Sequence, residues 1–109
     1  MTTEEPTSSP TPAGRPGLPS GVTSGSLWEV AGQHGVVRLR LVGKWARGEA
    51  APGDPVEIIV GYAKRPTTIE TVRLQHAFER VTGLRFIVRE ESSVSLTERE
   101  VLRREARML

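Results

Sequence analysis

The residues of this sequence that could act on a phosphate group lie in one stretch, residues 42–60, which reads VGKWARGEAAPGDPVEIIV. A glycine turn at Gly43 precedes a short polar segment, and a Pro/Gly/Asp loop leads into a strand. Backbone amides at a turn that opens a helix bind phosphate readily, and Lys44 beside the turn adds a positive charge. Near the start of the strand the only acidic residues are Asp54 and Glu57, and Asp54 is the only aspartate of the chain. The stretch therefore has the outline of a phosphate site but few of the carboxylates that bind Mg²⁺.

The elements that must position these residues follow from the spacing of apolar residues and from helix start and stop signals. Their order, α-β-α-β-α-β-α, predicts a mixed α/β (α+β) domain in which helices back a small sheet of three to four strands. The expected elements are a helix over 26–35, a strand over 36–42, a short helix over 44–50, a strand over 56–62, a helix over 67–82, a strand over 84–90 and a helix over 96–108.

Within these elements the pattern also predicts which side chains are buried. In the first strand we expect the odd-numbered residues to face the core: Val37, Leu39 and Leu41. In the long helix we expect a core stripe of four residues: Leu74, Ala77, Phe78 and Val81. Ile69 and Val72 lie off that stripe, so they either contact another chain or pack under the loop that precedes the helix.

Composition limits the organisation of the chain and the classes of function. The 109 residues suffice for one domain, over 26–109, and the Pro/Ser/Thr/Gly-rich segment 1–25 is predicted to be a disordered tail. The sequence contains no cysteine, which excludes disulfides, thiolate metal sites and a cysteine nucleophile. We find no secretory signal and no apolar run long enough to span a membrane, so we expect a soluble, cytoplasmic protein. The net charge of +2 and the dispersed arginines argue against a general nucleic-acid-binding role.

With the elements in this order, residues 37–60, VRLRLVGKWARGEAAPGDPVEIIV, resemble the signature of the minimal nucleotidyltransferases, or MNT proteins. These belong to the polymerase-beta-like superfamily and are often encoded beside HEPN-domain partners. In that family a strand ends in a Gly-Ser turn, an A-R-G-E-A segment follows, and Ser-Asp-x-Asp opens the next strand. A third Asp lies on the strand after the long helix. The resemblance covers residues 27–109 and implies a nucleotidyltransferase-like fold.

The resemblance also assigns roles to positions, and most of the assigned positions hold other residues here. The turn glycine is present as Gly43, but Lys44 stands at the serine position. Pro55 stands at the first carboxylate position and Glu57 at the second. Ile87 stands at the third. Of these three only Glu57 could bind a metal ion, and its longer side chain shifts the carboxylate at a site where small displacements are costly.

These substitutions lead to two interpretations. In the first, the chain is a catalytically inactive nucleotidyltransferase-like domain that requires no cofactor and acts as a binding or regulatory subunit. The resemblance implies a HEPN-like helical partner, for example a toxin RNase for which this chain is the antitoxin, and it leaves a homodimer open. In the second, the chain is an active protein adenylyltransferase-type antitoxin that uses Mg²⁺ and ATP. Asp54 and Glu57 would then share the metal ion, which requires a bulge to turn Asp54 onto the face of Glu57.

Other residues of the stretch have both functional and structural interpretations. Gly43, Lys44 and Arg47 are the candidates for binding a nucleotide phosphate, although Arg47 is expected to form a structural ion pair with Glu49 or a neighbouring loop. Trp45 is expected to pack in the domain or at an interface. Two lone histidines, His34 and His76, are assigned structural roles. A buried Glu57 requires a cationic partner, and the strand arginines could neutralise it, or alternatively bind an acidic partner or RNA: Arg38, Arg40, Arg85 and Arg89.

Overall fold

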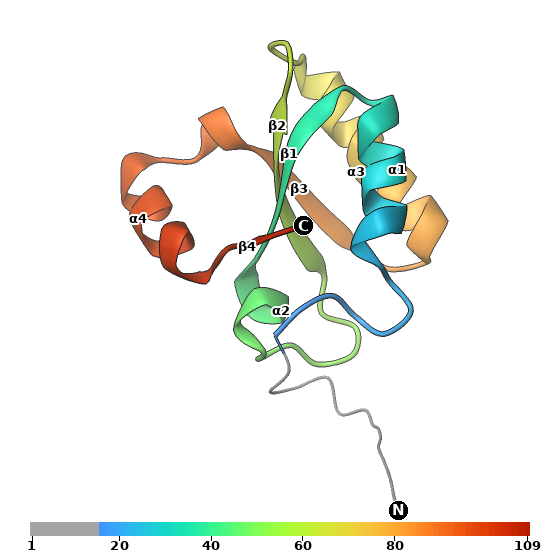
Figure 1. The fold of residues 1–109 in the computed structure, drawn as a ribbon, viewed down its shortest axis with the longest axis vertical. Helices are drawn as coiled ribbons and strands as arrows, with labels where there is room; N and C mark the ends of the chain where they lie inside the picture. Colours follow the sequence, from blue (N-terminus) through green and yellow to red (C-terminus); the bar gives the residue numbers. More distant parts are fainter. Residues whose placement is uncertain (1–15) are drawn as a thin grey trace, which may run out of the picture.

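The computed structural model describes residues 16–109, which form one sheet with helices on both sides (Figure 1). The predicted tail, apart from its last ten residues, lies outside the described residues. The elements in chain order are α1 (Ser24–Gln33), β1 (Val36–Val42), α2 (Gly43–Arg47), β2 (Val56–Tyr62), α3 (Thr68–Thr82), β3 (Phe86–Glu90), the 3₁₀ turn η2 (Glu91–Ser93), α4 (Leu96–Glu105) and β4 (Arg107–Met108).

The sheet is mixed and has the strand order β3-β2-β1-β4. Strand β1 runs antiparallel to both β2 and β4, whereas β2 and β3 are parallel and are joined by the long helix α3. Helices α1 and α3 lie on one side of the sheet and α4 lies on the other (Figure 1). The predicted α+β class with three to four strands is therefore confirmed.

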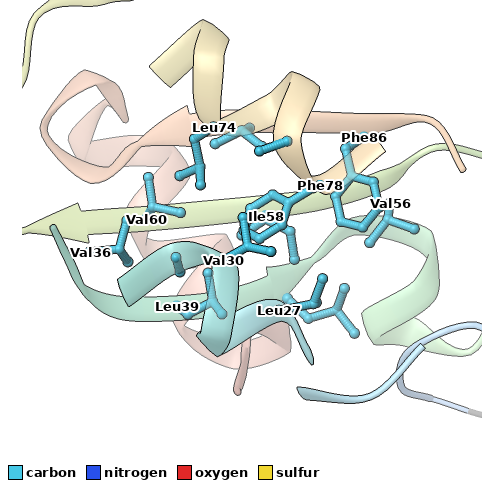
Figure 2. Close-up of a cluster of buried hydrophobic side chains, with 14 of the residues drawn as sticks. Leu27, Val30, Val36, Leu39, Val56, Ile58, Val60, Leu74, Phe78 and Phe86 are labelled. Carbon is cyan, nitrogen blue, oxygen red and sulfur yellow. The ribbon is translucent and has the colours of Figure 1, made fainter. Parts of the chain in front are cut away.

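The main core lies between the sheet and the helices α1 and α3 (Figure 2). Phe78 of α3 and Phe86 of β3 are fully or almost fully buried, and their rings stack with centroids 5.2 Å apart. Leu27 of α1 and Ile58 of β2 also belong to this core. Successive strand residues alternate between the two faces of the sheet, so the neighbours of Ile58 along β2 point to the other face. The β2 residues on the opposite face, among them Glu57, are consequently turned toward the side of α4.

The burial pattern of β1 corrects one prediction. Leu39 and Leu41 are fully buried as expected, but Val37 is 48% exposed and Val36 is buried in its place. The cause is a register shift against β2, since Val36 pairs with Tyr62 while Arg38 pairs with Gly61. The extra residue reverses the alternation at the start of the strand, which the period of two along the sequence does not reveal.

The long helix agrees closely with its sequence signals. Thr67 is the N-cap of α3, and its side chain accepts a hydrogen bond from the Glu70 amide. Gly83 ends the helix with φ +73°. The predicted stripe is buried at its first three positions, but Val81 is 58% exposed, which corrects the prediction at its fourth position.

The last helix is shorter than predicted. Helix α4 ends at Glu105 because Ala106 has extended backbone, and Arg107–Met108 form an edge strand on β1. The Leu109 amide donates to the Leu39 carbonyl, and Leu109 packs against the main core. The chain end is therefore tied to the sheet rather than continuing as helix.

The folded part also starts earlier than residue 26. The Gly17 amide donates to the Trp45 carbonyl at 2.9 Å, and Leu18 and Val22 pack against the core. Residues 16–25 thus belong to the domain, although their composition alone placed them in the tail. Within residues 16–109, no helix has both the length and the apolar character needed to cross a membrane.

Candidate functional site

The predicted glycine turn lies where β1 meets α2. Gly43 has φ +78°, a conformation that favours glycine, and it is buried. A Cβ atom at this position would lie 2.7 Å from Cδ of Glu57. Glycine is therefore favoured here by the backbone conformation, and the Glu57 carboxylate lies directly over it.

The three carboxylate positions come together on the face of the sheet away from the main core. Glu57 lies between two cross-strand neighbours, Val42 on β1 and Ile87 on β3. Pro55 precedes β2 by one residue, and Ile87 is 42% exposed. Of the three positions, only the second therefore supplies a carboxylate, that of Glu57 beside the glycine turn, and the neighbouring position on β3 is apolar.

Asp54 makes its interactions inside its own loop. Its Oδ2 accepts a hydrogen bond from the Ala51 amide at 2.9 Å and lies 3.9 Å from Nζ of Lys44. The Asp54 carbonyl accepts a hydrogen bond from Nε1 of Trp45, which is buried and so packs in the domain as expected. These bonds fix the loop between α2 and β2. Lys44, the residue at the serine position, is thus paired with this loop carboxylate.

Sequence reasoning missed a second carboxylate at the turn, that of Glu105 at the end of α4. Its Oε1 accepts a hydrogen bond from the Gly43 amide at 3.4 Å and another from Nη1 of Arg47 at 3.1 Å. Nε of Arg47 also donates to Glu49 at 2.8 Å. Only 17% of the Glu105 side chain is exposed. The backbone amide and the arginine that were candidates for a phosphate therefore hold an internal carboxylate.

A signal for Glu105 was present in the sequence. Glu105 follows Leu102 by three residues and precedes Ala106, so it lies on the apolar side of α4 that packs on the sheet. A carboxylate at such a position requires a polar partner on the neighbouring element. What the sequence alone does not identify is that partner, since Gly43 lies 62 residues earlier.

The donor set of this site is poorly suited to a metal ion. Within residues 16–109, no three His, Asp or Glu side chains lie together in an arrangement that could hold one. Mg²⁺ requires octahedral oxygen coordination, commonly with more than one carboxylate when no substrate supplies the rest. The carboxylates beside Gly43 are those of Glu57 and of Glu105, which already accepts hydrogen bonds from the Gly43 amide and Arg47. The other two positions hold Pro55 and Ile87, whose side chains have no oxygen. These residues do not form the three-carboxylate centre of nucleotidyl transfer.

Three of the four strand arginines, Arg38, Arg40 and Arg89, form ion pairs with glutamates other than Glu57. Arg89 also interacts electrostatically with Glu57. Arg38 forms a two-nitrogen ion pair with Glu91, with Nε 2.8 Å from Oε2, and Arg40 lies 3.4 Å from the same carboxylate. Arg89 forms a two-nitrogen pair with Glu98 at the start of α4. Gly61 makes room for the first pair, since a Cβ there would lie 2.7 Å from Nε of Arg38.

The ion pair of Glu91 predicts a pH dependence of stability. Its hydrogen bonds from Arg38 lower the pKa of the Glu91 carboxyl below its usual value. A carboxyl with a lowered pKa in the folded state contributes stability above its ordinary pKa of about 4.3, and this contribution is lost as the pH falls through the folded value. We therefore expect Glu91→Gln to lower the urea midpoint at pH 7. As the pH is lowered below about 4, the urea midpoint of this variant should fall less than that of the wild type. Glu29→Gln, on the exposed side of α1, is the control, and equal acid sensitivity of both variants would contradict the prediction.

The fold and the turn define a nucleotidyltransferase-like domain whose site has altered contents, and comparison with solved structures agrees. The chain is 30% identical to a solved structure described as a minimal nucleotidyltransferase, with a TM-score of 0.70, over 78% of this chain and 87% of the other. It also superposes with TM-score 0.72 and 11% identity on a toxin-antitoxin structure with AMP-PNP, over 80% and 72% of the two chains. A third similar structure, at TM-score 0.62 and 10% identity over 77% and 66%, is that of a tri-AMPylated Shewanella oneidensis HEPN toxin in complex with an MNT antitoxin.

The first of these similarities identifies the family. At 30% identity over most of both chains, it places this chain among the minimal nucleotidyltransferases. The chain therefore belongs to the minimal nucleotidyltransferase family. The other two similarities, at lower identity, show the shared fold. No protein-family model and no curated protein sequence matches the chain.

Proposed function

We propose that this chain is a minimal nucleotidyltransferase-like subunit without metal-dependent transfer activity, and that it regulates a HEPN-like helical protein by binding it. The observation that supports the first part is the content of the carboxylate positions, Pro55, Glu57 and Ile87. A transfer site of this family would use several carboxylates to hold metal ions against a triphosphate. Of the three positions, this chain has a carboxylate at one, that of Glu57.

The turn beside Glu57 supports the same conclusion. In a nucleotide site the Gly43 amide and Arg47 would be free to meet phosphate oxygens. Here both donate to Glu105, whose carboxylate supplies the negative charge from within the chain. A phosphate would have to displace this carboxylate, and like charge disfavours binding beside it.

The kind of partner is supported by the structural relatives. One of them is a complex of a HEPN toxin with an MNT antitoxin, and the fold of this chain matches that structure. A subunit of this fold without catalytic activity can still bind a partner through its surface, and fold alone does not fix function. Ile69 and Val72 of α3 are exposed on the outer side of the helix and are apolar surface for such a contact.

The loss of transfer activity predicts a specific biochemical result. The purified chain, incubated with Mg²⁺, α-labelled ATP and a HEPN-type protein encoded beside it, is expected to transfer no label above background. Glu57→Ala should give the same result, because a single carboxylate does not assemble the metal centre. Transfer that requires Mg²⁺ and is abolished by Glu57→Ala would show instead that the chain is an active transferase.

The binding part of the proposal is tested separately from catalysis. Co-expression with that HEPN-type protein, followed by size-exclusion chromatography, is expected to give a stable complex, and the complex should form equally with Glu57→Ala. Ile69→Ala with Val72→Ala tests the α3 surface, with Val37→Ala as the matched control at another exposed valine. Failure of the wild-type chain to form any complex would contradict the regulatory role.

A further inference from the structure

A cavity of about 720 Å³ lies between the sheet and α4, on the same face as Glu57 but toward the other end of the strands. Its floor includes Arg38 and Arg40 of β1. One wall is the loop after β2, with Lys64 and Arg65, and the opposite wall is α4. Figure 1 shows α4 standing apart from the strands on this side of the sheet. We call this cavity the basic groove.

The charge of the basic groove is strongly unbalanced. Six cationic side chains line it against two carboxylates, a formal excess of four positive charges. The cationic residues are Arg38, Arg40, Lys64, Arg65, Arg99 and Arg103. Glu91 is engaged by Arg38 and Arg40, and the Glu90 carboxylate accepts hydrogen bonds from Ser92. Within residues 16–109, neither Lys64 nor Arg65 forms a salt bridge.

The two charged residues of α4 in the groove are Arg99 and Arg103. Arg99 and Arg103 are four residues apart, so they project from one side of the helix about 5–6 Å apart at Cβ. Arg103 has only an exposed partner, Glu100, at 3.5 Å, and such surface pairs contribute little. Arg99 donates one hydrogen bond, from Nη2 to the Glu91 carbonyl at 3.4 Å, which leaves its other N–H groups for an acidic ligand. The Arg103 guanidinium is available to such a ligand at little energetic cost.

The floor of the basic groove is apolar as well as charged. Val42, Ile59 and Val94 form a second buried cluster, separate from the main core, against which Leu102 and Ala106 of α4 pack. All five of these residues line the groove. Helix α4 has no fully buried residue, so this small cluster is most of what attaches its middle to the sheet. The apolar surface of the groove that remains accessible is that of Met108, which is 68% exposed, and of the half-buried Leu102 and Ala106. A ligand that places an apolar group here would bury this surface.

We propose that the basic groove is the docking site for a segment of a partner protein in which acidic residues flank one or two apolar side chains. Such a segment satisfies both features of the groove, since its carboxylates meet the cationic walls and its apolar side chains meet the floor. A nucleic-acid backbone satisfies only the first of these two features. The inference rests on the proposed function in that the partner is the protein that this subunit regulates, and it extends that function by assigning the contact surface.

The test uses fluorescence anisotropy with defined probes and the full chain. A short labelled peptide of Glu-Glu-Leu-Leu repeats is expected to bind, with an affinity that falls as salt is raised. Peptides of Lys-Lys-Leu-Leu repeats and an oligouridine of similar length should bind much more weakly. Charge reversal on α4, Arg99→Glu with Arg103→Glu, should weaken acidic-peptide binding by about tenfold or more, because it replaces attraction by repulsion at two sites.

Two further variants distinguish a loss of binding from a loss of folding. Lys64→Glu with Arg65→Glu changes the opposite wall without touching α4 and should also weaken binding. Arg73→Glu with Arg80→Glu makes the same change of charge on exposed positions of α3, across the sheet, and should leave the affinity within about twofold. No binding of the acidic peptide, equal losses in all three variants, or tighter binding of oligouridine would overturn the inference.

The outcome is separable from that of the proposed function. If the co-expressed HEPN-type protein binds the Arg99→Glu, Arg103→Glu variant as tightly as the wild type, the groove is not the contact surface and the regulatory role stands. If that protein binds no variant while the acidic peptide binds the groove as described, the groove stands and the assigned class of partner is wrong.

Discussion

Replacing Phe78 with alanine is expected to lower the free energy of unfolding by about 3–5 kcal/mol, the range for removing a buried phenylalanine. Phe78 is fully buried between α3 and the sheet, and its ring stacks on Phe86 with an interplanar angle of 29°. The substitution removes this contact and leaves a cavity that a small core closes only in part. Domains of this size are stable by only about 5–10 kcal/mol, so the variant should lose about a third or more of its stability.

Urea denaturation followed by circular dichroism measures this effect. The matched control is Val81→Ala, one turn further along α3, where the side chain is 58% exposed and the expected change is below about 0.5 kcal/mol. A loss of less than about 1 kcal/mol for Phe78→Ala would show that α3 does not supply the main core. Such a result would also mean that packing of α3 is not what holds β2 and β3 in place.

Replacing Gly43 with alanine is expected to cost about 1–3 kcal/mol, because an alanine at φ +78° is held in a disfavoured conformation. A second contribution comes from Glu57, whose Cδ lies 2.7 Å from the position of the added methyl group. The Glu57 carboxylate is the end of a flexible side chain and can move aside, so the backbone conformation supplies the larger part. Thermal melting should therefore show a lower midpoint, by about 4–8 °C for each kcal/mol.

A double-mutant cycle separates the two contributions. Gly43→Ala combined with Glu57→Ala removes the contact with Glu57 but keeps the backbone cost, so the two substitutions should couple by about 0.5–1 kcal/mol in the favourable direction. Gly53→Ala is the control for the backbone alone, because Gly53 has φ +95° and nothing lies within 4 Å of its added methyl group. Strict additivity in the cycle would mean that Glu57 does not lie over the turn.

How far the sequence predicts this protein depends on the range of the signals involved. The helix α3 could be predicted to within a residue because Thr67, Glu70 and Gly83 act on backbone groups only a few positions away. The contents of the carboxylate positions are also a property of the sequence, since no arrangement in space gives Pro55 or Ile87 an oxygen donor on its side chain. The order of helices and strands completes this set, because it depends on periodicity within each segment.

The tertiary structure decided what those residues meet. The sequence does not show that Arg38 and Arg40 pair with Glu91, because that pairing depends on the register of β1 against β2 and on the space above Gly61. The end of α4 at Glu105 was likewise set by pairing of the following residues with the edge of β1, which overrides the helical pattern of the segment.

What the sequence determined by itself is thus the class of fold and the loss of most of a carboxylate set. What only the tertiary structure decided is the partner of the glycine turn, the Glu105 carboxylate on the Gly43 amide, and the basic groove between α4 and the sheet. Both depend on where α4 returns across the sheet. That position is determined by long-range packing and charge, whose partners lie tens of residues apart and leave no local pattern in the chain.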